Sequence, residues 1–274
     1  MIKLAFSTNA FKLYSLEDSI KEIAKEGYSG VEILCDIPHA YPPIFSDKQI
    51  RSLKETLSSF DMQISNLNAF TLYAIGDVYH PSWIEDSREM RIEHTIDCIR
   101  LAKKIGAKHL STEPGGPLPL QSAGVNQLEK MFLDGLTRVA KIADEEEIKV
   151  LIEPEPGLLI ENSKQFKKFF TRVVNPRHIG LNFDIGHFYC VNEDPASLVY
   201  ELSDYIEHFH LADIANTRIH NHLIPGKGSI DFRRVLDAMD DIGYHGFVTV
   251  ELYPYQDNPV QAAREAFSYL CSIM

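Results

Sequence analysis

One stretch of the sequence reads Gly180-Leu181-Asn182-Phe183-Asp184-Ile185-Gly186-His187. It is an apolar run that ends in a carboxylate, a glycine and a histidine. A strand in a globular core needs no charge, so a charge at its carboxyl end needs a reason. Three other apolar runs end in the same way, at Glu153, His210 and Glu251. Glu, Asp, His and Glu at four strand ends form a possible metal-ligand set.

Short apolar runs alternate with longer segments of helical periodicity along the chain, and no low-complexity linker separates them. We expect strands at residues 2–8, 30–35, 63–67, 108–112, 149–153, 179–184, 206–210 and 246–251. Helices are expected at residues 16–27, 46–59, 86–105, 127–147, 163–173, 195–202, 231–242 and 259–272. Among these helices, the expected N-caps include Ser15, Ser46 and either Asn162 or Ser163.

Eight strand-then-helix units in roughly 250 residues are typical of an α/β protein with a (β/α)8 TIM barrel fold. We expect residues 1–274 to form this barrel as a single domain. An open doubly wound sheet is the alternative, but no GxGxxG motif follows the first strand. The barrel also explains the polar strand ends, because the carboxyl ends of all its strands meet on one rim.

Composition and charge weigh against several functional classes. The chain is 45% hydrophobic and 24% charged, which is typical of a soluble globular protein. Its net charge of −12 and the lack of a Lys/Arg cluster weigh against nucleic-acid binding. No apolar run reaches membrane-spanning length, and the N-terminus does not resemble a secretory signal. The four cysteines form no CxxC pair, so we expect reduced thiols and a cytoplasmic location.

Each candidate ligand has a structural alternative when it is considered alone. Glu153 suits a solvated loop acid, Asp184 an N-cap, His210 a hydrogen-bonded core histidine, and Glu251 a partner for a nearby cation. The joint pattern in four consecutive units favours a metal site. Three carboxylates and one imidazole suit one divalent ion such as Mn²⁺, Co²⁺ or Mg²⁺, and the imidazole also admits Zn²⁺ or Fe²⁺.

Several motifs occur in a characteristic order: Leu151-Ile152-Glu153-Pro154, Phe183-Asp184-Ile185-Gly186-His187, His208-Phe209-His210-Leu211-Ala212-Asp213, His222-Leu223-Ile224-Pro225-Gly226-Lys227-Gly228 and Val250-Glu251. Over essentially its whole length, the chain resembles the xylose isomerase-like TIM barrel superfamily of sugar phosphate isomerases and epimerases. That superfamily also includes ketose 3-epimerases, hydroxypyruvate isomerases, inosose dehydratases and endonuclease IV. The resemblance implies that Glu153, Asp184, His210 and Glu251 bind metal, and that His187 hydrogen-bonds substrate hydroxyls.

The sequence also departs from the epimerase pattern. Those enzymes usually carry an arginine where this chain has His222, and its nearest arginine, Arg218, lies further upstream. His222 is instead similar to the endonuclease IV arrangement, in which His187 would bind a second metal. That nuclease needs three metals and further histidines, whereas this chain has Asn68 and Glu113 at the expected places and His220 where an Asp is expected. A full nuclease cluster is therefore not predicted.

The predicted chemistry is proton removal next to a carbonyl, with a metal stabilising the enediolate. Glu153 and Glu251 would remove and return the proton from the two faces of the substrate. Return to the same carbon gives epimerisation, return to its neighbour gives isomerisation, and loss of a β-hydroxyl gives dehydration. A metal-bearing binding protein without turnover is a further alternative.

The expected substrate is a small carbohydrate or polyol. Its predicted contacts are His187, His222, Glu113 and Glu155. A long loop at residues 69–86 is a candidate lid, and six aromatic residues are candidates for either the substrate wall or the core: Phe6, Phe11, Phe70, Tyr73, Trp83 and Tyr253. Similar families often form homo-oligomers, so one is possible here.

Overall fold

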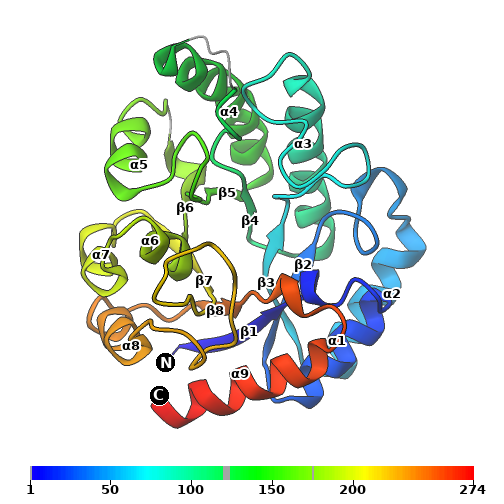
Figure 1. Ribbon diagram of the computed structural model, residues 1–274. Coiled ribbons are helices and arrows are strands. Elements are labelled where there is room, and N and C mark those ends of the chain that lie inside the picture. Colours follow the sequence, from blue (N-terminus) through cyan, green and yellow to red (C-terminus); the bar gives the residue numbers. More distant parts are fainter. Residues whose placement is uncertain (1, 120–123, 175) are drawn as a thin grey trace.

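The computed structural model describes residues 2–119, 124–174 and 176–274. Eight parallel strands close into a barrel in the order of the sequence, which confirms the predicted (β/α)8 fold (Figure 1). The strands are β1 (Lys3–Ser7), β2 (Gly30–Leu34), β3 (Gln63–Asn68), β4 (His109–Thr112), β5 (Lys149–Ile152), β6 (Ile179–Asp184), β7 (Ile206–Leu211) and β8 (Phe247–Val250). The barrel closes where β1 pairs with β8, with Lys3 opposite Phe247 and Phe6 opposite Val250.

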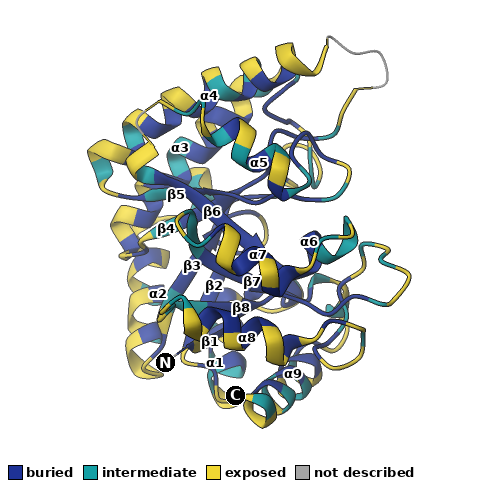
Figure 2. Cartoon of the chain, turned by 90° about the vertical axis from the view of Figure 1, so that its left-hand side faces the viewer, coloured by how far each residue is buried: buried dark blue, intermediate teal, exposed yellow. Residues whose placement is uncertain are grey.

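The helices surround the barrel, and their outer faces are exposed while the strands are almost entirely buried (Figure 2). They are α1 (Leu16–Lys25), α2 (Asp47–Ser59), α3 (Arg88–Ile105), α4 (Val125–Glu146), α5 (Ser163–Phe170), α6 (Ile185–Cys190), α7 (Pro195–Glu201), α8 (Phe232–Asp241) and α9 (Pro259–Ile273). Within the described ranges, no helix combines the length and the hydropathy that crossing a membrane requires.

Local sequence signals explain where several helices begin. Ser15, Ser46 and Asn162 each accept a hydrogen bond from a backbone N–H of the first helical turn, as N-caps do. The helix at Ser46 has a complete capping box with Gln49. The sequence analysis did not anticipate α6, which begins directly after β6. Asp184 caps it, because its Oδ1 accepts a hydrogen bond from the His187 backbone N–H at 2.8 Å.

The interior of the barrel is unusually polar. TIM barrels are commonly filled by bulky branched side chains, but here Glu32 of β2 contacts His210 of β7. These strands are not neighbours in the closed sheet, so the contact crosses the interior. Ser65 of β3 and Thr249 of β8 also meet across the barrel at 2.9 Å. The polar interior lies beneath the rim on which the predicted ligands stand.

Candidate active site

The four predicted metal ligands come together on the carboxyl rim of the barrel. Glu153 directly follows β5, Asp184 ends β6, His210 lies in β7, and Glu251 directly follows β8. Asp184 and His210 are opposite each other in the β6–β7 ladder. One ligand atom from each of the four residues lies within 4.8 Å of the others, and all four side chains are buried. The ends of four adjacent strands thus form one compact donor set, the predicted metal-ligand cluster.

The donor set fits a divalent cation. Glu153 Oε2 and Asp184 Oδ2 are buried and have no hydrogen-bond partner among the described residues, which is costly for carboxylate oxygens unless a cation compensates them. His210 Nδ1 lies 2.8 Å from Glu153 Oε1 and 3.8 Å from Glu251 Oε2. Burial alone would lower the pKa of His210, but Glu153, Glu32 and Glu251 together hold it well above its usual value. The cluster therefore attracts positive charge strongly.

Two asparagines orient the carboxylate of Glu251. Asn9 Nδ2 donates to Glu251 Oε1 at 2.7 Å, and Asn68 Nδ2 donates to the same oxygen at 3.0 Å. The other oxygen, Oε2, faces His210 Nδ1. From the sequence, Asn68 was notable only as a departure from the nuclease pattern, and Asn9 was not predicted as a site residue. The only sequence signal for either residue was an amide side chain just after, or at the end of, an apolar strand.

Glu32 is a further site residue that the sequence analysis missed. Its Oε2 lies 2.5 Å from His210 Nε2, and its side chain is fully buried. Burial alone would raise the pKa of Glu32, but His210 and hydrogen bonds from Asn66 and Ser7 lower it overall. A charged residue in the middle of the apolar run Gly30–Leu34 was the available signal. Because Glu32 lies within the strand and not at its carboxyl end, the strand-end pattern does not include it.

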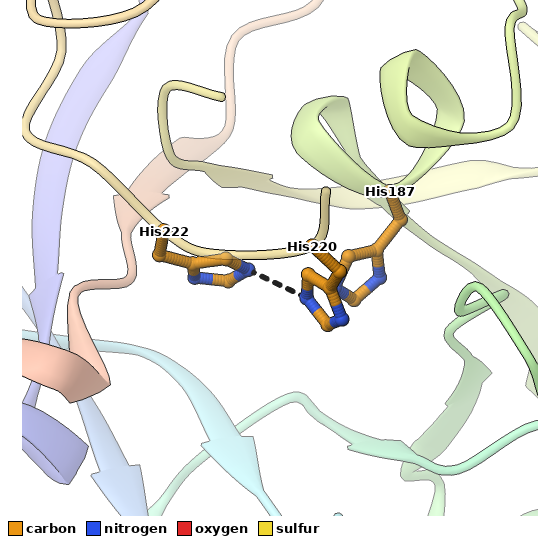
Figure 3. A group of neighbouring side chains, drawn as sticks. All are labelled: His187, His220 and His222. Carbon is orange, nitrogen blue, oxygen red and sulfur yellow. Dashed lines mark hydrogen bonds between the residues drawn. The ribbon is translucent and has the colours of Figure 1, made fainter. Parts of the chain in front are cut away.

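Three histidines face one another on the rim (Figure 3). Two of them lie next to predicted metal ligands, His187 by Asp184 and His222 by Glu251. His187 comes from α6, whereas His220 and His222 come from the loop between β7 and α8. His187 Nδ1 lies 2.9 Å from the Pro154 carbonyl oxygen, and His222 Nδ1 lies 2.9 Å from that of Glu251. We therefore place a proton on each of these Nδ1 atoms, which leaves both Nε2 atoms free to accept.

The remaining contact joins two of these rings. His220 Nε2 lies 3.1 Å from His222 Nε2, so we assign His220 as the donor. Burial lowers the pKa of His220 to about 2 and that of His222 to about 4, so both rings are neutral. His187 Nε2 lies 3.7 Å from Asp184 Oδ2. Burial alone would lower the pKa of His187, but Asp184, Glu155 and Glu153 raise it overall. The three rings together suit either hydrogen bonds to substrate hydroxyls or a second metal, the two roles considered for His187 from the sequence.

A cavity of about 150 Å³ opens above the metal-ligand cluster. Its polar lining includes Glu153, Glu251, Glu155, His187 and His220. Its aromatic lining includes Phe70, Tyr73, Tyr79 and Tyr253. Three of these four belong to the predicted lid loop at residues 69–86, so this loop forms a wall of the cavity. Of the other aromatic candidates, Phe6, Phe11 and Trp83 are fully buried in the core.

Glu155 faces this cavity from the segment after β5. Its Oε1 accepts a hydrogen bond from the Tyr79 hydroxyl at 2.7 Å. Burial raises the pKa of Glu155 to about 7, against the opposing influence of His187 and Tyr79. At neutral pH this carboxyl group is therefore able both to donate and to accept a hydrogen bond. The link to Tyr79 also connects the lid loop to the rim of the barrel.

Three other residues named from the sequence do not line this cavity. Glu113 is fully buried, is absent from the cavity lining and has its Oε1 3.6 Å from Arg91 Nε. His222 lies behind His220, which lines the cavity. The guanidinium of Arg218 lies over the Tyr189 ring, 3.9 Å from its centroid, and is also absent from the cavity lining.

Glu113 should make the stability of the protein depend on pH. Burial raises its pKa to about 8, although Arg91 opposes this shift. The folded state therefore holds a proton that the unfolded chain releases near pH 4.5, so the stability due to Glu113 falls as pH rises from about 5 to 8. Compared with the wild type, Glu113→Gln should gain up to a few kcal/mol in unfolding free energy over that range. Urea denaturation at pH 5, 6, 7 and 8 measures the difference, and a difference independent of pH would contradict the shift.

Comparisons with known proteins place this geometry in a family. A family model described as xylose isomerase-like TIM barrel matches residues 20–273. The inosose dehydratase of Clostridium beijerinckii is 22% identical over 275 residues, which cover 93% of this chain and 89% of that protein. The fructoselysine 3-epimerase of Escherichia coli O157:H7 is 25% identical, over 97% of this chain and 96% of that protein.

The structural comparison agrees with the family match. A crystal structure of the IolI protein with a bound zinc atom has a TM-score of 0.79 at 21% identity, and the match covers 99% of this chain and 98% of that one. At 21% identity, this structural similarity to the IolI protein shows a shared fold and nothing more. The dehydratase and the epimerase show that relatives spanning nearly the whole chain are enzymes. This chain therefore belongs to the xylose isomerase-like TIM barrel family.

Proposed function

We propose that the protein is a divalent-metal-dependent isomerase or epimerase of a small sugar, sugar phosphate or inosose. One observation carries this proposal: Glu153 and Glu251 belong to the metal-ligand cluster and also line the cavity. Two carboxylates in that position are suited to move a proton on a bound substrate. The epimerase and the dehydratase among the relatives, and the zinc atom of the IolI structure, support this reading.

Glu153, Asp184, His210 and Glu251 would hold one divalent ion, such as Mn²⁺, Co²⁺, Mg²⁺ or Zn²⁺. When bound, such an ion supplies Lewis acidity that stabilises negative charge on a substrate oxygen. The two unpartnered oxygens, Glu153 Oε2 and Asp184 Oδ2, are the donors most clearly available to it. Asn9 and Asn68 hold one oxygen of Glu251 in place, so its other oxygen has a defined direction.

The protein side chains would divide the reaction among them. Glu153 would accept a proton from the carbon next to the substrate carbonyl, and Glu251 would return one, or the two would act in the opposite order. His187 would accept a hydrogen bond from a substrate hydroxyl through Nε2, because its Nδ1 is engaged by Pro154. Glu155 is proposed as a further polar contact, and His222 would support His220 at the cavity wall. Phe70, Tyr73 and Tyr253 would limit the access of water.

Solvent deuterium tests this function directly. The metal-loaded protein should incorporate deuterium from D₂O next to the carbonyl of at least one member of a panel of ketoses, their phosphates and inososes. Removing the metal with a chelator should abolish incorporation, and adding Mn²⁺ or Co²⁺ back should restore it. Mass spectrometry of the recovered sugar reads out the result. Tight binding of panel members without any exchange would indicate a binding protein instead.

Two other activities of the same site, dehydration and DNA cleavage, would give different results in these experiments. Dehydration of an inosose would appear in the same assay as a product that is lighter by one water. A nuclease is favoured only by the three facing histidines, which offer a second metal site. Nicking of abasic-site DNA, together with more than one metal per chain, would replace the sugar function with the nuclease.

A further inference from the structure

We infer that Glu32 is the positioning residue for the proposed metal ligand His210, an inference that depends on the metal centre of the proposed function. Glu32 stands in the layer of the barrel beneath the rim, whereas the four proposed ligands stand on the rim. It belongs to β2, which β1 and β8 separate from β7 in the closed sheet. Its role would be to fix the proton and the orientation of the His210 ring.

The two nitrogens of His210 face different surroundings. Nδ1 faces the carboxylates of the rim, 2.8 Å from Glu153 Oε1 and 3.8 Å from Glu251 Oε2. Nε2 faces the barrel interior and lies 2.5 Å from Glu32 Oε2. An imidazole that binds a metal through one nitrogen must carry its proton on the other. Only the Nε2–H form, donating to Glu32, leaves the Nδ1 lone pair free for the metal.

Glu32 is itself held firmly. Asn66 Nδ2 donates to Glu32 Oε2 at 2.7 Å, and Asn66 Oδ1 accepts from His109 Nδ1 at 2.9 Å. Asn66 Nδ2 also lies 3.1 Å from Ser111 Oγ. A hydrogen-bonded chain thus runs from β4 through β3 and β2 to the ring of His210 in β7. This chain gives a physical reason for a buried glutamate in the middle of an apolar strand.

The expected consequence concerns metal affinity. A buried carboxylate that accepts the N–H of a ligating histidine fixes its tautomer and makes the ring a stronger donor, and loss of such a partner weakens metal binding about 10- to 100-fold. Glu32 lies outside the cavity lining, so its loss should leave direct substrate contacts intact. The effect of its substitution should therefore appear in the metal dissociation constant of the protein without substrate.

The test compares Glu32→Gln with a control on the strand of His210. Glu207→Gln changes a glutamate of β7 that pairs with Lys149, so it controls for the loss of one carboxylate. Calorimetry with Co²⁺ and Mn²⁺ measures affinity, and the visible spectrum of bound Co²⁺ reports its ligand geometry. We expect Glu32→Gln to bind either ion about 10- to 100-fold more weakly with an altered Co²⁺ spectrum, and Glu207→Gln to match the wild type.

A second variant covers the case in which Glu32→Gln does not fold. Glu32→Asp keeps the charge but withdraws it from His210 by one methylene, so it should weaken metal binding in the same direction by a smaller factor. A folded Glu32 variant with wild-type affinity and an unchanged Co²⁺ spectrum would overturn the inference while leaving the proposed function intact. A wild-type protein that binds no divalent metal would instead overturn the metal centre itself.

Discussion

Glu153→Gln and Glu251→Gln should each slow the exchange of substrate hydrogen with solvent by about 10²- to 10⁴-fold, the contribution expected of a positioned general base. Glutamine keeps the shape of the side chain and one oxygen but cannot take up a proton at neutral pH. Both side chains are buried in the metal-ligand cluster and line the cavity. Deuterium incorporation, measured on the substrate found in the panel, gives the rate for each variant.

The two substitutions also change proposed metal ligands, so metal content must be measured alongside the rate. A variant that holds a full complement of metal but has lost exchange isolates the proton-transfer role. Glu161→Gln is the matched control. Glu161 lies in the segment after β5, as Glu153 does, but it accepts a hydrogen bond from the Gly157 N–H and is not part of the cluster. Exchange that is unaffected in both Glu153→Gln and Glu251→Gln would remove the basis for the proposed chemistry.

The sequence analysis predicted the barrel well because its evidence is local. Apolar runs, helix caps and spacing each depend on neighbouring residues, and the eight strands fall close to the predicted ranges. Asp184, His210, Glu153 and Glu251 could also be anticipated, because a barrel brings all strand ends to one rim.

Residues that act across the barrel could not be found in this way. Glu32 and His210 are 178 positions apart in the sequence, and Asn9 and Glu251 are 242 apart. Their pairing depends on the register and curvature of the closed sheet, which the pattern of apolar residues does not specify. Glu113 illustrates the converse. It directly follows a strand, as Glu153 and Glu251 do, yet its side chain lies beside Arg91 instead of in the cavity.

Arg91→Met should lower the free energy of unfolding by about 3–5 kcal/mol, because three buried carbonyls lose their donor and each unsatisfied group costs about 1–3 kcal/mol. The guanidinium of Arg91 is fully buried beneath the lid loop. Its Nε donates to the Pro81 carbonyl at 2.9 Å, and its Nη1 donates to the carbonyls of Phe70 at 2.6 Å and Ala69 at 3.3 Å. Methionine fills much of the same space but leaves all three carbonyls without this donor.

Arg100→Met supplies the control on the same helix, because Arg100 is exposed and pairs only with Asp97 among the described residues. Exposed pairs of this kind contribute about 0.2–1 kcal/mol, so urea denaturation should separate the two variants clearly. Equal losses would mean that water molecules hydrogen-bond the three carbonyls when Arg91 is removed.

Because the loop that Arg91 holds also carries Phe70, Tyr73 and Tyr79 into the cavity, Arg91→Met should raise KM in the exchange assay more than it lowers kcat. A stability loss without that change in KM would show that the loop keeps its position without its buried anchor.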